Sequence, residues 1–158
     1  MKSYTLSKRN VKTIIDRMTK TWPVTPEFNK SIQVRIVEIN EHKRLLIFTN
    51  LEAIELEGLL IPTLKSTELL QSFPYVEVDQ GAVSYICNGA DVMRPGIVGW
   101  VAFKKGDIVG VRESKYKKFI AIGIALINES DMRGMSKGAV AKNVHYIGDR
   151  LWATYKQP

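Results

Sequence analysis

Glycine is distributed very unevenly along this chain of 158 residues, and no other feature constrains its fold as much. One glycine, Gly58, lies before residue 80. The other ten lie after residue 80, at positions 81, 89, 96, 99, 106, 110, 123, 134, 138 and 148. Short apolar runs separated by frequent turn residues are typical of small β-barrels. We therefore expect the C-terminal part to be a β-rich, barrel-like domain that begins between Ser72 and Tyr75.

The part of the chain before residue 74 has the pattern of an α+β domain. Apolar side chains recur at three- and four-residue steps from Val11 to Met18, which predicts a helix that begins after the N-cap residue Ser7. Alternating apolar and polar residues predict a strand at 32–36 that forms a hairpin with a strand at 44–49. After a short segment at 54–60, Pro62 and Thr63 open a second predicted helix, which Pro74 stops.

Beyond residue 74 the sequence predicts several short strands and one short helix. Asp79 is placed to cap the start of a helix that runs to Asn88, and Gly89 to end it in a left-handed conformation. Strands are expected at residues 75–78, 97–103, 108–112, 119–127 and 144–147. The chain is therefore predicted to be an α+β protein with an N-terminal domain at 1–73 and a C-terminal domain at 74–158.

The charge is compatible with a polyanionic partner but does not by itself indicate one. There are 23 Lys and Arg residues against 16 Asp and Glu, a net charge of +7. Residues 1–20 hold six basic side chains and one acid, and residues 104–118 hold six and two. Such clusters neutralise phosphates in RNA, but lysine-rich faces also keep proteins soluble and guard sheet edges. The candidate basic contacts for such a partner are Lys8, Arg9, Lys12, Lys104, Lys105, Lys115, Lys117, Lys118, Lys137 and Arg150.

Several classes of function are disfavoured. With one cysteine, Cys87, and two distant histidines, His42 and His145, the chain offers no disulfide and no histidine pair at metal-binding spacing. It also lacks GxSxG and GxxxxGK motifs. We therefore expect no metal, no cofactor and no enzymatic activity, and a structural or RNA-contacting role for His145. The longest apolar run is too short to span a membrane and the start of the chain is not a secretory signal, so the cytoplasm is the expected location.

A series of short motifs after residue 74 resembles the PUA domain, an RNA-binding pseudobarrel named after pseudouridine synthases and archaeosine transglycosylases. No single motif is specific, but their order is. The motifs are Asp79-Gln80-Gly81-Ala82, the segment from Gly89 to Gly96, Gly106-Asp107-Ile108-Val109, Gly138, and His145-Tyr146-Ile147-Gly148-Asp149.

The whole chain is similar to the stand-alone pre-PUA plus PUA translation factors, which include the T-cell-lymphoma-amplified reinitiation factor, part of ligatin, and archaeal counterparts. The similarity rests on the basic N-terminal helix, the segment Ile61-Pro62-Thr63-Leu64 and the tail from Asn143 to Trp152. It implies RNA as partner, either ribosomal RNA or tRNA, together with the small ribosomal subunit. It also implies a protein partner at the N-terminal domain, which the sequence itself does not show.

In PUA domains that bind RNA, the helix after the first strand, its glycine-rich exit and the second strand form much of the contact surface. By this resemblance the candidate residues are Gly81, Gly89, Ala90, Asp91 and Arg94. The glycines equally fit structural turns, and Asp91 fits either a base contact or a turn cap. Tyr116, which lies among lysines, is the better candidate for stacking on an unpaired base, whereas Tyr85 fits a packed position as well.

The function expected from the sequence is non-catalytic RNA binding in translation, at the small ribosomal subunit or at tRNA held there. The alternative is an accessory subunit that confers RNA specificity on a separate tRNA- or rRNA-modifying enzyme.

Overall fold

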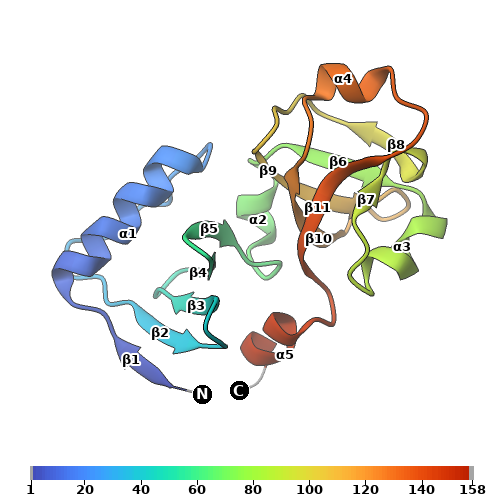
Figure 1. The fold of residues 1–158 in the computed structure, drawn as a ribbon. Helices are drawn as coiled ribbons and strands as arrows, with labels where there is room; N and C mark the ends of the chain where they lie inside the picture. Colours follow the sequence, from blue (N-terminus) through green and yellow to red (C-terminus); the bar gives the residue numbers. More distant parts are fainter. Residues whose placement is uncertain (1, 157–158) are drawn as a thin grey trace. The chain divides into compact units, whose positions relative to one another are not determined.

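The computed structural model describes residues 2–156, and the chain divides into two compact units. We call Met1–Ser72 the N-terminal unit and Phe73–Pro158 the C-terminal unit. Each combines a β-sheet with helices, so the predicted α+β class is confirmed (Figure 1).

The N-terminal unit is built on one antiparallel sheet with strands in chain order, β1-β2-β3-β4-β5. Its elements are β1 (Ser3–Thr5), α1 (Lys8–Thr21), β2 (Arg35–Glu38), β3 (Lys43–Ile47), β4 (Glu52–Leu56), β5 (Leu59–Pro62) and α2 (Thr67–Leu70).

Helix α1 forms as its sequence predicts. The Ser7 hydroxyl accepts a hydrogen bond from the backbone N–H of Asn10 at 3.2 Å, which caps the first turn. Val11, Ile14 and Met18 form its buried face. Where the helix ends, Trp22 is buried and its Nε1 donates to the carbonyl of Leu60 at 3.0 Å, which fastens the end of α1 to β5.

Four other features of this unit differ from the sequence prediction. Strand β2 begins only at Arg35, and the sequence did not predict β1. The helix expected from Pro62 shrinks to the four residues of α2, because Pro62 pairs with Ala53 and belongs to the edge strand β5. The segment at 54–60 spans parts of two strands, β4 and β5, joined at Glu57 and Gly58, which have φ of 48° and 87°. Two consecutive residues with positive φ are typical of a tight hairpin turn.

The C-terminal unit contains a six-stranded sheet in the order β7-β11-β10-β9-β6-β8, whose strands are labelled in Figure 1. Strands β6 and β9 pair in parallel and the other neighbours are antiparallel. Its elements are β6 (Tyr75–Val78), α3 (Gln80–Ile86), β7 (Val92–Met93), the 3-10 turn η1 (Arg94–Gly96), β8 (Ile97–Trp100), β9 (Ile108–Glu113), β10 (Phe119–Ala125), α4 (Glu129–Arg133), β11 (Ala139–Tyr146) and α5 (Arg150–Lys156).

Helix α3 has the predicted capping residues at both ends, Asp79 and Gly89, although its last helical residue is Ile86 and not Asn88. The Asp79 carboxylate accepts from the backbone N–H of Ala82 at 3.0 Å, as an N-cap does. At the other end Gly89 has φ of 97°, and its N–H bonds to the carbonyl of Ile86. The N–H of Ala90 bonds to the carbonyl of Tyr85, which completes a Schellman motif.

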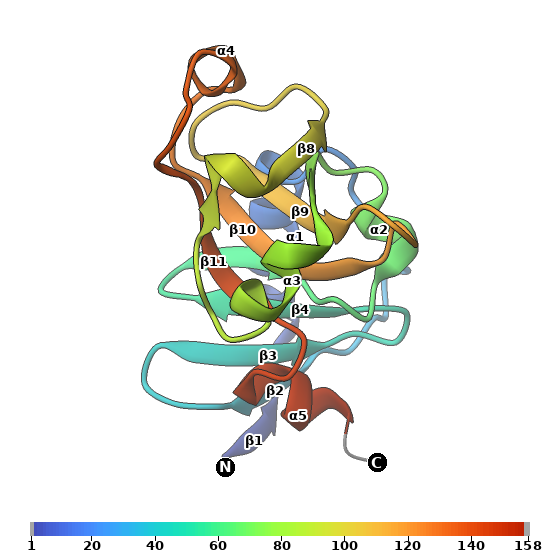
Figure 2. The same ribbon diagram turned by 90° about the vertical axis from the view of Figure 1, so that its right-hand side faces the viewer.

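Apolar side chains of the strands and of α3 and α4 enclose the core of the C-terminal unit. They include Val76, Ile86, Val109, Ile120 and Met132. In both views α4 and α5 lie at opposite ends of this unit (Figures 1 and 2). Within residues 2–156, no helix combines the length and the apolar character needed to cross a membrane.

Candidate nucleic-acid interface

The turn between β9 and β10 carries the best-defined basic surface of the C-terminal unit. We call residues 114–118 the basic tip. Glu113, at the end of β9, is 6% exposed and accepts hydrogen bonds from the backbone N–H groups of Lys115 at 2.9 Å, Tyr116 at 2.7 Å and Lys118 at 3.1 Å. A fourth bond comes from the Gln80 amide at 2.6 Å. One buried carboxylate therefore fixes the backbone of the tip.

Glu113 keeps its charge in this position. Burial raises the pKa of its carboxyl, but the hydrogen bonds from Lys118, from Gln80 and from the other tip amides outweigh burial and hold the pKa below its ordinary value. Glu113 was not among the residues predicted from the sequence. The available signal was an acidic residue at the end of an apolar strand, directly before a turn rich in lysine.

The tip presents one aromatic ring and three ammonium groups. Tyr116 is 75% exposed, and the Lys115 ammonium lies 5.0 Å from the centre of its ring. Lys117 adopts φ of 59°, and its Nζ lies 2.9 Å from Glu77 Oε2. Because Glu77 pairs with Lys117, the tip charges left without an ion pair among residues 2–156 are Lys115 and Lys118.

Glu77 also holds the end of β9. Its Oε1 accepts from the Arg112 guanidinium at 2.8 Å and 2.5 Å, and that guanidinium stacks 3.7 Å from the centre of the Tyr75 ring. Burial raises the pKa of Glu77, but the hydrogen bonds and charges of Lys117 and Arg112 outweigh burial and lower it. The network joins β6 to β9 beside the basic tip.

The five lysines within residues 104–118 do not gather at one place, because they lie at the two ends of β9. Lys104 and Lys105 precede β9, where the Lys105 N–H donates to Asn128 Oδ1 at 2.9 Å, whereas the tip lysines follow it. The six residues of β9 separate the two groups by roughly 20 Å at about 3.3 Å per residue. Although these lysines are close in sequence, they do not form a single contact surface.

Residues 89–91, which follow α3, make contacts that stabilise the fold. A Cβ on Gly89 would lie 3.3 Å from the Tyr146 ring, so both backbone conformation and space favour glycine there. Asp91 Oδ1 accepts from the backbone N–H of Asn143 at 3.0 Å. The Asn143 amide in turn donates to the carbonyl of Ala90 at 3.0 Å. Gly81 and Ala90 are exposed on α3 and at its exit.

The Arg94 guanidinium makes several contacts within the C-terminal unit. Its Nε donates to the carbonyl of Met132 at 3.0 Å, its Nη1 to that of Ile97 at 3.3 Å, and its guanidinium lies 5.4 Å from the centre of the Trp100 ring. Lys137 is exposed and adjoins Gly138, whose carbonyl accepts from the Arg94 backbone N–H at 2.8 Å.

His145 belongs to a buried structural pair. It is 0% exposed, and its Nδ1 lies 2.8 Å from Asp149 Oδ2. Asp149 Oδ1 also accepts from the backbone N–H of Trp152 at 2.7 Å, which caps α5. Burial raises the pKa of Asp149, but the His145 hydrogen bond and charge and two backbone donors outweigh burial and lower it. Arg150 is exposed in the first turn of α5.

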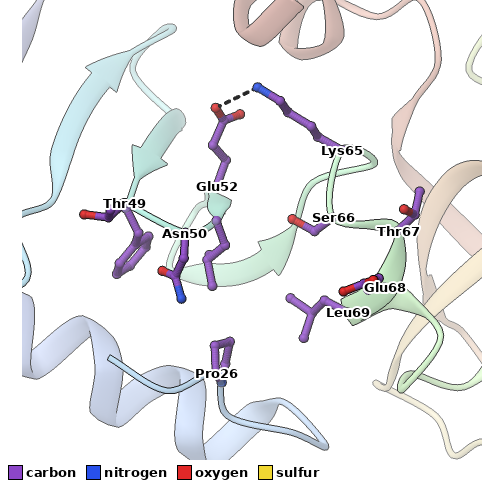
Figure 3. Close-up of a pocket in the computed structure, with 11 residues that line it drawn as sticks. Pro26, Thr49, Asn50, Glu52, Lys65, Ser66, Thr67, Glu68 and Leu69 are labelled. Carbon is purple, nitrogen blue, oxygen red and sulfur yellow. Dashed lines mark hydrogen bonds and ion pairs between the residues drawn. The ribbon is translucent and has the colours of Figure 1, made fainter. Parts of the chain in front are cut away.

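The N-terminal unit contains a hollow of about 640 Å³ that is unsuited to phosphate. Its one basic lining residue, Lys65, is paired with Glu52 at 3.3 Å, and Glu68 adds a second carboxylate (Figure 3). The predicted contacts Lys8, Arg9 and Lys12 are exposed on α1 instead.

Within residues 2–156, no three His, Cys, Asp or Glu side chains form a group that could hold a metal ion. Cys87 is a partly buried thiol, and burial raises its pKa although the charge of Lys118 opposes this.

Residues 74–147 match the PUA domain family. This part of the C-terminal unit is therefore a PUA domain, which defines the class of protein.

Relatives extend the similarity to the whole chain. An uncharacterized protein of Methanocaldococcus jannaschii is 38% identical over 156 residues, 96% of this chain and 95% of that protein. Translation machinery-associated protein 20 of Schizosaccharomyces pombe is 32% identical over 130 residues, 76% of this chain and 72% of the relative. The crystal structure of a hypothetical protein from Pyrococcus horikoshii has a TM-score of 0.79 and 31% identity, covering 97% of this chain and 99% of that one.

The chain belongs to the family of PUA-domain proteins that contains translation machinery-associated protein 20, the malignant T-cell-amplified sequence proteins and archaeal relatives. The family expected from the sequence is thus confirmed.

Proposed function

We propose that this protein is a non-catalytic RNA-binding factor of translation that contacts the small ribosomal subunit, tRNA held there, or both. In this proposal residues 74–158 bind RNA and residues 1–73, a pre-PUA domain, position them and supply further basic contacts. The cytoplasm is the corresponding site of action.

The observation that carries the proposal is the basic tip. Glu113 fixes its backbone, so Lys115, Lys118 and the exposed Tyr116 ring are held on a rigid turn of the PUA domain. Ammonium groups neutralise phosphates, and an exposed aromatic ring stacks on an unpaired base. A rigid support reduces the entropy lost when these groups bind.

Relatives supply the biological context. The Schizosaccharomyces pombe relative is named for its association with the translation machinery. Family membership and the +7 net charge of this chain agree with an RNA partner in the same process.

The test is binding of the purified protein to small ribosomal subunits, with and without initiator tRNA, compared with free tRNA over a salt titration. Saturable subunit binding that survives near-physiological salt is the expected result. Binding to free tRNA alone would reject the ribosomal proposal in favour of an accessory subunit for an RNA-modifying enzyme.

A pair of matched variants tests the tip itself. K115A/K118A removes two charges at the tip, and the matched control K2A/K20A removes two exposed charges of the N-terminal unit that are not among the predicted RNA contacts. If both tip lysines touch phosphate, the first variant lowers the salt slope by about 1.4, at about 0.7 per phosphate on single strands. Equal losses from both variants would show a general charge effect and no contact at the tip.

A further inference from the structure

A groove in the N-terminal unit combines an apolar floor with a basic rim. It has a volume of about 480 Å³ and lies between α1 and the segment 26–32. The floor contains Val11, Ile15, Phe28 and Ile32, and the rim carries Lys8 and Lys12 from α1 and Lys30 from the facing segment. We call this the α1 groove.

The rim of the α1 groove carries lysines that are exposed and available to a ligand. Within residues 2–156, none of the three forms an ion pair or a side-chain hydrogen bond. The half-buried carboxylate of Glu55 binds Arg17 and Arg44 at 2.7 Å each and is therefore not available to these lysines. The α1 groove therefore carries three positive charges that no described side chain neutralises.

The floor offers a surface for a flat apolar group. Phe28 is half-buried, and its ring is supported from within the unit by Phe48, with ring centres 5.0 Å apart. Ile15 is likewise half-buried on α1. A nucleotide has the complementary chemistry, since its base stacks on apolar and aromatic surfaces while its phosphate seeks ammonium groups.

We propose that the α1 groove binds an unpaired nucleotide of RNA, with the base on the floor between Ile15 and Phe28 and the flanking phosphates at the lysine rim. This inference rests on the proposed function and adds to it a second, single-strand-specific contact outside the PUA domain.

The volume of the α1 groove fits a ligand of nucleotide size. The groove is within the range of about 300–1,000 Å³ typical of small-ligand sites. The adjoining hollow, which shares Pro26 with this groove, carries Glu52 and Glu68, whose carboxylates oppose any polyanion that extended across it, so we expect the bound RNA to leave the groove in another direction.

The test uses the full-length protein and a fluorescent oligouridylate, either single-stranded or annealed to oligoadenylate. We expect Phe28→Ala, which removes the aromatic ring from the floor without changing charge, to weaken single-strand binding roughly tenfold, the loss of about one stacked base. Duplex binding should change little. Unchanged single-strand binding by a variant with the wild-type melting temperature would overturn the inference.

A second variant measures the rim and has a matched control. K8A/K12A/K30A should lower the single-strand salt slope by about 2, at about 0.7 for each phosphate that is no longer neutralised. K2A/K20A/K43A removes the same charge outside the groove and should lower the slope by less. Equal effects would overturn the inference.

Cross-linking with thiouridine-substituted oligouridylate locates the bound RNA even if a variant is unstable. Cross-links to peptides that contain Ile15 or Phe28 support the inference, and cross-links confined to the PUA domain overturn it while leaving the proposed function intact. If wild-type protein binds neither oligouridylate nor ribosomal subunits, the proposed function itself fails. If a helical peptide rich in Glu and Leu occupies the groove and no RNA does, the inference is overturned and the groove is a protein-binding site.

Discussion

Replacing Asp149 with alanine should strongly destabilise the C-terminal unit, because the Asp149 carboxylate joins the end of β11 to the start of α5. The carboxylate has three hydrogen-bond partners: the buried His145 imidazole at 2.8 Å and the backbone N–H groups of Tyr146 at 3.0 Å and Trp152 at 2.7 Å. The first two contacts hold the end of β11, and the third caps α5. No side-chain atom of alanine can accept these bonds.

The cost follows from two effects. Loss of the helix N-cap costs about 1 kcal/mol. An acceptor withdrawn from the fully buried His145 adds about 1–3 kcal/mol. The sum is about 2–4 kcal/mol, which for a domain of this size lowers Tm by roughly 10–30 °C. Asp149→Asn keeps one acceptor oxygen and should cost less.

Thermal unfolding followed by near-ultraviolet circular dichroism measures this effect, with urea unfolding as a second measurement. The pKa of Asp149 is depressed in the folded protein. Its charged form therefore adds stability above the unfolded pKa of about 3.9, and that stability is lost as the pH falls through the folded pKa. The difference between wild type and Asp149→Ala should be full near neutral pH and shrink in acid. A loss below about 0.5 kcal/mol, within the range of ordinary surface substitutions, would refute the reasoning.

Three further substitutions test the PUA domain. Gly110→Ala should cost about 1–3 kcal/mol by overpacking, because a Cβ would lie 2.6 Å from the Phe119 ring; an unchanged Tm would contradict this. Gly89→Ala should cost about 1–2 kcal/mol through its positive φ and its approach to Tyr146; wild-type urea stability with weaker RNA binding would instead make Gly89 an RNA contact. Glu113→Gln should speed hydrogen exchange of the basic-tip amides, since a neutral amide has one acceptor oxygen; unchanged protection would show that the carboxylate does not hold the tip.

Local signals in the sequence were sufficient for several elements. Ser7 and Asp79 cap α1 and α3 as predicted, because capping involves a side chain and a backbone N–H three residues later. Gly89 ends α3 for an equally local reason, the low cost of positive φ in glycine. The glycine-rich second half and its ordered motifs were sufficient to predict a PUA domain.

Where local signals compete with strand pairing, the predictions from the sequence were wrong. Pro62 is a common type of first residue in a helix, yet pairing with Ala53 holds it in β5. The Glu57-Gly58 turn is a weaker hairpin signal than Asn-Gly or Asp-Gly, so β4 and β5 were not predicted as separate strands.

The arrangement of the candidate contacts depended on the tertiary structure. Lys105 and Lys115 are close in sequence, but β9 carries them to opposite ends of one strand. Conversely, Glu77 and Lys117 are far apart in sequence and form an ion pair at 2.9 Å, because β6 pairs in parallel with β9.

The sequence by itself determined the family, the α+β class, the net positive charge and the helix caps, because these depend on composition or on residues within one turn of each other. Only the tertiary structure decided which charges are neutralised, which turn is held rigid by Glu113, and where lysines from α1 and from segment 26–32 share one groove. Those properties require contacts between residues that the chain brings together only when it folds.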